Sequence, residues 1–375
     1  MTLSEPPLLP GQRRERLLAD LHTHGTLRVS EIARALGVTT VTVRRDIAQL
    51  ADEGAIERVH GGIRLPRGGD GQPHLRVAVA EPGRAGGADE SSLPAVGMVV
   101  PSLDYYWPEI IRGARDAAPD AGVRIVLRGS SYDDVADVRR QTTWLLETAG
   151  IQGLLIAPPT LGEQAAQLID WLAGLDIPVV FLERTATVGV YHEHVESVST
   201  DHAFGASLAV RHLAARGHRR VGFLASASSP HTPAVRRGWQ QTVADIDLDP
   251  DTPELISPDH RDPRWDAEID RGIDAWLATG TTALLAHSDR EAISLVTRCE
   301  ERGIGVPGDL AVVAFDDEVA GLANPTLSAI RPAKYTIGES AMQLLSQRIL
   351  DPARPVHRVL ISPQLIVRDS SGTRQ

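Results

Sequence analysis

The sequence predicts an α/β protein in which two doubly wound parallel-sheet subdomains follow a small domain of three helices and a β hairpin. Two observations carry this prediction. Beyond residue 94, short apolar strands alternate with amphipathic helical stretches, which is typical of βαβ units and of parallel sheets covered by helices on both faces. Before residue 66, three helical periods are followed by an alternating segment with a Gly-Gly turn.

Composition limits the class of protein. The 375 residues are 42% hydrophobic, enough for more than one packed domain. The single cysteine, Cys299, excludes an intramolecular disulfide and fits a reducing compartment. No nucleophile constellation surrounds it, so we expect an ordinary core or surface residue. Neither a signal peptide nor an apolar run of membrane-spanning length is visible, which predicts a cytoplasmic protein without membrane contact.

Charge is distributed unevenly. The net charge is −11, but residues 11–67 hold ten Arg against seven Asp or Glu, a local charge of +3 that leaves −14 for the remainder. Charge is informative per domain, and this asymmetry indicates a small basic module on an acidic body.

The first domain is predicted at residues 1–65. Helical periods cover residues 13–23, 29–36 and 40–53. Gly37 and Gly54 stand where the second and third helices would end. The stretch "AIERVHGGIRL" then alternates and turns at Gly61-Gly62, as a two-stranded wing does. Together these elements indicate a winged helix-turn-helix.

The third helix, within "VTTVTVRRDIAQL", has an unusual outer face. Val43, Ile47 and Leu50 form one apolar stripe, which places Arg44 and Arg45 on the opposite face with small and β-branched residues. Arginine pairs bidentately with guanine or phosphate, and Thr and Val methyl groups contact thymine methyls. Thr39 can cap the helix, whose free N–H groups can meet a phosphate. This face predicts binding in a DNA major groove.

This domain resembles the DNA-binding module of DeoR-type bacterial transcription repressors over about 55 residues. The matching residues are Arg13, Leu17, Leu21, Thr39, Thr42, Val43, Arg44, Arg45, Asp46, Ile47 and the "RVHGG" of residues 58–62. Together with the cap at Thr39, the resemblance implies DNA-facing roles on the helix for Thr40, Thr42, Arg44 and Arg45, and on the wing for Arg58, His60 and Arg64. Asp46 is interpreted as an ion-pair partner that orients a neighbouring Arg, and His60 could equally be a turn residue.

Residues 66–93 are predicted to be a flexible linker, since they are rich in Gly, Pro, Asp and Arg. The effector-binding domain is then expected at residues 94–375. Its predicted strands lie in "AVGMVV", "RIVLRGS", "GLLIAP", "PVVFLE", "RVGFLA", "ALLAH" and "LAVVAFDD". They form two series, and the predicted subdomains are about 94–200 plus 320–345, and about 201–319 plus 346–370. Ligands of such folds bind beyond the carboxyl ends of the strands, here between the subdomains.

The large domain resembles the effector-binding core of the lactose and galactose repressor family, itself similar to periplasmic sugar-binding proteins. Matching pieces include "VGMVVPSLDYYWPEIIRGARDAA", "VSTDHAFGASLAVRHLAARGHRRVGFLA" and "GIGVPGDLAVVAFDD", in order along nearly the whole region. DeoR-type proteins usually carry a domain resembling a sugar-phosphate isomerase instead. The combination of head and body is therefore the unusual feature.

The resemblance implies a set of ligand-binding residues. They are Asp104, Tyr106, Trp107, Trp265, Asp289 and Asp316. Aromatic faces that stack on a sugar and carboxylates that accept its hydroxyl protons suit a neutral sugar. The family places a ligand arginine three residues before a Gly-aromatic pair, where this chain has Val235, so Arg236 is the nearest substitute.

Each of these assignments has a structural alternative. Asp316 and Asp317 could cap a helix, and Asp104 could form an Asx turn. Tyr106 and Trp107 could belong to the core or to a dimer interface. Glu183 and Arg184 are interpreted as a hinge ion pair.

The predicted function is a sequence-specific, DNA-binding transcription regulator, a repressor, whose DNA affinity is modulated by a sugar. We expect a homodimer on operator DNA, located with the nucleoid in the cytoplasm, with no cofactor, no metal and no enzymatic activity. The alternatives are a sugar-binding protein or an enzyme of sugar metabolism on the same fold. Against an enzyme, no phosphate-binding loop, GxGxxG fingerprint or nucleophile elbow is present, and His192 and His194 lack a third metal ligand. A transporter-linked binding protein would need export and would lack the DNA-binding head.

Overall fold

The computed structural model describes residues 26–28, 32, 43, 47, 50, 57–59, 62–64, 93–258 and 262–372. The chain divides into two compact units, residues 1–86 and 87–375. The linker predicted at residues 66–93 lies outside the described residues, apart from Leu93.

The first unit contains a three-stranded antiparallel sheet. Its order is β1 (Thr26–Arg28), β3 (Gly62–Arg64) and β2 (Glu57–Val59), and Val59 is paired with Gly62. The predicted hairpin is thus confirmed, with β1 as a third strand that the sequence pattern did not predict. Val43, Ile47 and Leu50 are helical and buried, which confirms the predicted apolar stripe. The predicted helix at residues 13–23 and the two glycine caps lie outside the described residues.

The first sheet of the second unit has six parallel strands in the order β16-β10-β7-β6-β4-β5. They are β4 (Ala95–Val100), β5 (Arg124–Gly129), β6 (Leu154–Ile156), β7 (Val179–Leu182), β10 (Ser197–Thr200) and β16 (Arg358–Ile361). Along β4, Met98 packs into one core and Val99 into the other. A strand buried on both faces has no polar side, which explains its continuous apolar run.

The second sheet has the order β12-β11-β13-β14-β15-β17. Its strands are β11 (Val221–Ser226), β12 (Glu254–Ser257), β13 (Ala283–His287), β14 (Ala311–Phe315), β15 (Ser328–Arg331) and β17 (Gln364–Ile366). All neighbours are parallel except β17, which pairs antiparallel with β15. Two parallel α/β sheets confirm the predicted fold class of this domain.

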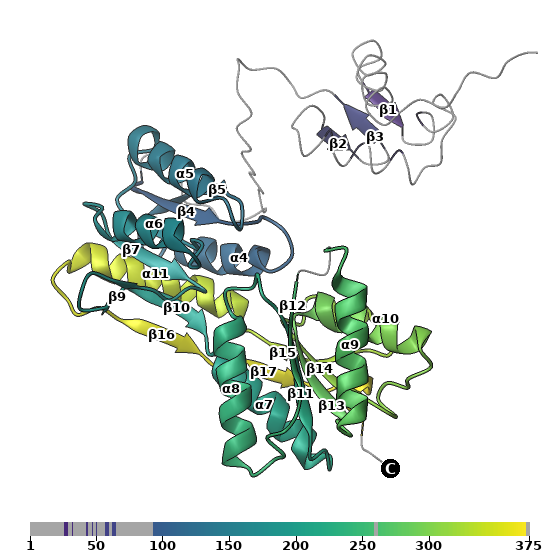
Figure 1. Cartoon of the computed structure of the whole chain (residues 1–375). Helices are drawn as coiled ribbons and strands as arrows, with labels where there is room; N and C mark the ends of the chain where they lie inside the picture. The colour runs from purple at the N-terminus through teal and green to yellow at the C-terminus, as the bar shows by residue number, and fades with distance from the viewer. Residues whose placement is uncertain are drawn as a thin grey trace, which may run out of the picture. The chain divides into compact units, whose positions relative to one another are not determined.

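Helices cover both faces of each sheet (Figure 1). The first sheet packs against α4 (Trp107–Ala117) and α11 (Lys334–Leu350) on one face, and against α5 (Val135–Thr148) and α6 (Glu163–Ala173) on the other. The second sheet packs against α7 (His202–Ala215) and α8 (Thr232–Asp245), and against α9 (Trp265–Ala278) and α10 (Asp289–Glu301). Shorter elements are β8 (Thr187–Val188), β9 (Glu193–His194), η2 (Ala320–Leu322) and η3 (Asp369–Ser371). Of the described helices, none is both long and apolar enough to cross a membrane.

The chain crosses between the two subdomains three times, after β10, between β15 and α11, and between β16 and β17. This differs from the predicted division. The predicted division puts β15 in the first subdomain, but β15 pairs with β14 of the second. It puts β16 in the second subdomain, but β16 pairs with β10 of the first. Both strands are short and carry polar residues, so neither gives the apolar run that marks a central strand.

Helices α4 and α11 cross at close range. A Cβ added at Gly338 would overlap the backbone of Ile110, and one at Gly113 would overlap the carbonyl of Tyr335. Glycine allows such an approach because it has no side chain. The crossing holds α4, and therefore the residues before it, against the first sheet.

Candidate effector site

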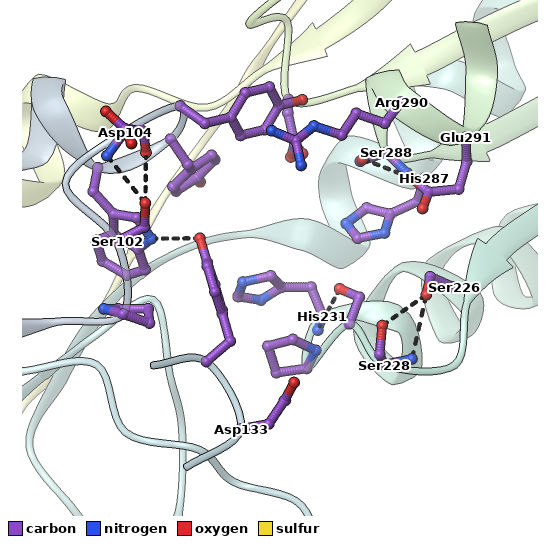
Figure 2. A pocket seen from close by; sticks show the side chains of 18 of the residues that line it. Ser102, Asp104, Asp133, Ser226, Ser228, His231, His287, Ser288, Arg290 and Glu291 are labelled. Atoms are coloured by element: carbon purple, nitrogen blue, oxygen red, sulfur yellow. Dashed lines mark hydrogen bonds between the residues drawn. The ribbon is translucent and has the colours of Figure 1, made fainter. Parts of the chain in front are cut away.

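A cavity of about 750 Å³ is lined by residues of both subdomains. The residues follow the carboxyl ends of six strands, where parallel α/β sheets place their ligands. The first subdomain contributes Tyr105, Tyr106, Trp107, Tyr132 and Arg184, here called the first wall. The second contributes Ser226, His231, His287, Arg290 and Asp316, here called the second wall. Figure 2 shows His231, His287 and Arg290 around one open space.

The first wall is rich in aromatic side chains, and hydrogen bonds to neighbouring residues hold two of their rings in place. The hydroxyl of Tyr106 donates to Oε1 of Glu183 at 2.6 Å, and the same carboxylate accepts the N–H and hydroxyl of Thr200 at 3.0 and 2.8 Å. Burial, and then the Glu183 carboxylate, raise the pKa of Tyr106 well above its usual value. The indole N–H of Trp107 donates to the hydroxyl of Tyr132 at 2.8 Å. These bonds hold the buried rings of Tyr106 and Trp107 in place, whereas Tyr132, at 46% exposed, is the aromatic residue most open to the cavity.

Arg184 links the two walls. The expected ion pair with Glu183 is wrong in detail, because the Glu183 carboxylate bonds to Tyr106 and Thr200 instead. The Nη1 group of Arg184 donates to the backbone carbonyl of Glu183 at 2.8 Å and lies 3.0 Å from Nε2 of His231. Arg184 is only 5% exposed, and burial lowers its pKa. Its contact with His231 joins the end of β7 to the start of α8, so Arg184 contacts residues of both subdomains.

Three histidine side chains form a cluster at the second wall. His231 and His287 line the cavity, and His202 lies behind His231. The ring of His202 stacks on that of His231 with centroids 4.1 Å apart, and His287 meets His231 edge to face at 6.3 Å. Nδ1 of His202 lies 2.9 Å from the carbonyl of Thr200. Burial lowers the pKa of all three, that of His287 to about 4, so the cluster is neutral near pH 7.

Glu183, His202 and His231 each offer one ligand atom within 4.8 Å of the others, a spacing that could hold a metal ion. Two observations oppose this role. The Arg184 guanidinium already faces His231 Nε2, and a cation there would repel a metal. The nearly parallel rings of His202 and His231, at 9°, also direct their in-plane lone pairs along parallel planes rather than to one point. The geometry favours a hydrogen-bonded network.

Backbone geometry at the cavity is unusual. Tyr105, Glu183 and Asp316 have φ values of +60°, +52° and +105°, the left-handed region that non-glycine residues rarely adopt. Each directly follows, or lies close to, the end of a strand at the cavity. Such outliers concentrate at ligand sites because the surrounding structure holds side chains in fixed directions.

Four of the expected ligand residues lie in the cavity lining, namely Asp104, Tyr106, Trp107 and Asp316. Asp104 is on the exposed rim, and its N–H donates to the hydroxyl of Ser102 at 3.0 Å, so Ser102 rather than Asp104 makes the local turn. Tyr106 and Trp107 are also core residues, as the alternative interpretation allowed. Asp316 is buried, and its pKa is raised well above the usual value by burial and then by Asp289.

The other three expected ligand residues lie elsewhere. Asp289 is fully buried, and its carboxylate accepts the N–H groups of residues 317–320 at 2.7 to 3.2 Å, so it anchors a loop. Trp265 packs in the core beneath α9 because its helix begins there with its apolar face inward. Arg236 is on the outer side of α8, where it pairs with Glu254. Asp317 caps no helix, and instead pairs with Arg331 and Arg368.

Sequence reasoning missed much of the lining. The missed residues include Tyr132, Asp133, Arg184, Ser226, Ser228, His231, His287 and Arg290. A usable signal existed, since Ser226 and His287 end β11 and β13, and Arg184 lies two residues after β7. Collecting every polar residue within a few positions of a strand end would have found them.

Most of the predicted DNA-contacting residues lie outside the part of the chain that the structure describes. Thr39, Thr40, Thr42, Arg44, Arg45 and His60 lie outside the described residues. Arg58 and Arg64 lie in β2 and β3, on the two strands of the wing, and only their backbone is described. Their roles therefore stay predictions.

Comparison with known proteins covers both parts of the chain. Residues 13–67 match the family of DeoR-like helix-turn-helix domains, and residues 210–371 match the periplasmic binding protein-like domain. The HTH-type transcriptional repressor PurR of Vibrio atlanticus is 24% identical over 92% of this chain and 98% of its own. The transcription regulator GntR from Chromobacterium violaceum has a similar structure, with a TM-score of 0.59 and 25% identity over 74% of this chain and 99% of its own.

A LacI family transcriptional regulator from Enterococcus faecium, solved with bound ribose, has a TM-score of 0.58 and 19% identity, covering 75% of this chain and 100% of its own. At that identity the likeness concerns the fold. The PurR relative, which matches over nearly its whole length, is a transcriptional repressor.

Proposed function

We propose that this chain is a sugar-controlled transcriptional repressor, since it joins a DeoR-like helix-turn-helix domain to a periplasmic-binding-protein-like domain and its homologues are LacI-family regulators. The observation that carries the proposal is the cavity between two subdomains in the same chain as that DNA-binding domain. The partly exposed rings of Tyr105 and Tyr132 on the first wall suit sugar rings, and the hydroxyls and imidazoles of the second wall suit sugar hydroxyls.

The switch requires different affinities of the effector for two states of the protein. A ligand in this cavity touches both walls at once only when the subdomains are close, so binding favours the closed arrangement. We propose that the protein acts as a homodimer on a two-fold operator, and that closure changes the spacing of the two heads. DNA contacts are assigned to Arg44 and Arg45 on the third helix and to Arg58 and Arg64 on the wing.

Binding of the purified full chain to DNA from its own upstream region tests the proposal, by fluorescence anisotropy at one fixed salt concentration, because phosphate contacts make affinity depend on salt. We expect specific binding that one sugar of a panel weakens. The double variant Arg44→Ala/Arg45→Ala should lose at least about 30-fold in affinity, at about 1–3 kcal/mol per base contact. Arg112→Ala, an exposed arginine of the effector domain, is the matched control. Absence of specific DNA binding by the parent chain would refute the proposal.

A further inference from the structure

Arg184 is a buried cation without a carboxylate in direct contact among the described residues. Its Nη1 is engaged with the carbonyl of Glu183 and with His231, while its Nε is buried and has no hydrogen-bond partner. Leaving a buried guanidinium without an acceptor is costly. The guanidinium edge formed by Nε and Nη2 is therefore the place where a ligand can complete the site.

Arg184 also stands at a junction. A second cavity of about 350 Å³ shares it with the main cavity, along with Tyr132, Asp133, Ser228 and Pro230. A substituent bound to Arg184 thus has room on either side, while the ring of the ligand stays in the main cavity.

A second cation lies on the opposite wall. Figure 2 shows Arg290 extending from α10 into the open space, and its guanidinium lies over the ring of Tyr105 at 4.4 Å. Within the described part of the chain, Arg290 has no carboxylate at ion-pair distance. The hydroxyl of Tyr105 and both ring nitrogens of His287 are buried without partners as well. These groups offer polar contacts that no side chain of the cavity uses.

Among the described residues, no acidic side chain of the cavity forms an ion pair with Arg184 or Arg290. Asp104 and Asp133 are on the exposed rim, and the Glu291 carboxylate accepts the N–H and hydroxyl of Ser288 at 2.8 and 2.7 Å. Asp316 is buried, and burial and the neighbouring Asp289 raise its pKa. Arg184 and Arg290 are therefore two cations of the lining that, among the described residues, contact no carboxylate directly.

We infer that the effector is an anionic sugar, whose carboxylate or phosphate oxygens bind the Nε–Nη2 edge of Arg184 while its hydroxyls bind Tyr105 and His287. The inference rests on the regulatory function proposed above and specifies its ligand. A guanidinium edge matches two oxygens of one anionic group, which gives strength and direction to the contact. Arg290 adds a second positive charge from the other wall. An anion between the two cations draws the subdomains together.

Isothermal titration of the full chain with matched pairs tests this. The acids are D-glucuronate, D-galacturonate and D-gluconate, the phosphate is D-glucose 6-phosphate, and the neutral partners are D-glucose, D-galactose and D-sorbitol. We expect at least one anion to bind ten-fold or more tightly than its neutral partner. Comparing the acids with the phosphate identifies which anionic group the site prefers.

Variants assign the effect to the site. Arg184→Met should abolish the preference for the anion. Arg184→Lys, which removes the two-pronged edge but keeps the charge, and Arg290→Met should each reduce the preference several-fold. Arg236→Met, an arginine paired with Glu254 outside the cavity, should retain it. Arg290 is exposed, so its variant remains informative if Arg184→Met does not fold, which circular dichroism reports.

Three outcomes overturn the inference. They are equal or tighter binding of the neutral sugars, no binding of any anion, and a preference that survives both Arg184→Lys and Arg290→Met. Operator binding is measured separately. DNA release by a neutral sugar would refute the anionic effector but leave the regulator intact, whereas failure to bind DNA would refute the regulator whatever the acids do.

Discussion

The two walls of the cavity differ in the side chains that they present and in the contacts that hold those side chains in place. The first wall carries aromatic rings held by hydrogen bonds to buried partners, such as Tyr106 to Glu183. The second wall carries imidazoles and hydroxyls on segments that start helices, such as Ser288, whose capping box with Glu291 fixes the start of α10. The first wall offers aromatic rings and the Arg184 guanidinium, whereas the second offers imidazoles, hydroxyls and the Arg290 guanidinium. The aromatic rings are held in place by buried hydrogen-bond partners behind them. The polar groups of the second wall instead lie at strand ends, in loops and at the starts of helices.

The second wall depends on one buried carboxylate. Asp289→Ala leaves four backbone N–H groups of residues 317–320 without their acceptor. We expect the free energy of unfolding of the effector domain to fall by about 4 kcal/mol, since each buried unsatisfied group costs about 1–3 kcal/mol and some regain water. Urea unfolding followed by circular dichroism measures this.

Asp262→Ala is the matched control, because Asp262 is half-buried and among the described residues its carboxylate bonds to Arg264, so the unfolding midpoint should hardly change. An Asp289→Ala protein of unchanged stability that binds ligand weakly would instead return Asp289 to the role of a ligand contact.

The second wall should also be the pH-sensitive one. The pKa of His287 is about 4 in the folded protein against a usual value of 6.5, so between these values the unfolded chain binds more protons than the folded one. Stability is therefore present at pH 7 and lost as the pH falls, by about 2 kcal/mol from His287 alone between pH 7 and pH 5. His202 and His231, whose pKa values are also lowered, add to the loss.

Urea unfolding at pH 7 and pH 5 checks the sign and the size. His287→Gln should reduce the difference between the two pH values, because the amide does not titrate. A variant that loses as much stability as the parent would show that the acid sensitivity has another source.

On the first wall, Tyr106→Phe removes the hydrogen bond to Glu183 but keeps the ring. We expect a loss of about 1–2 kcal/mol in the free energy of unfolding, because Glu183 keeps its bonds to Thr200. Ligand affinity should change little if the ring face is what the ligand uses. Tyr335→Phe, which removes an exposed bond to Asp116, is the control and should be neutral. A larger change in ligand affinity than in stability would indicate direct contact with the hydroxyl.

The smallest effect is expected at Tyr132, which is 46% exposed. Tyr132→Phe removes the acceptor of the Trp107 indole N–H, and water can replace it, so the loss should be below about 1 kcal/mol. Tryptophan fluorescence should show a shifted emission while the unfolding midpoint hardly moves. An unfolding midpoint that falls as far as in Tyr106→Phe would mean that the rim of the first wall is as rigid as its base.

The strands and helices with a regular local pattern of apolar residues can be predicted from the sequence alone. Apolar runs such as that of β4 predicted strands buried on two faces, and the spacing of Val43, Ile47 and Leu50 predicted a helix with one buried stripe, because periodicity reflects which side meets the core. Strands β15 and β16 escaped prediction, since their place at the crossings between subdomains is set by pairing partners far away in the chain.

Which residues share the cavity depends on how distant elements pack together. Asp289 and Asp316 look equivalent as acids at strand ends, yet Asp289 anchors a loop and Asp316 faces the cavity. Arg236 lies next to a family contact position, yet it pairs with Glu254 on the surface. Arg184 lies just after a strand end, and it joins the two walls of the cavity. Sequence spacing fixes a side chain's face on its own element, whereas its neighbours depend on how distant elements pack, and packing is a long-range property.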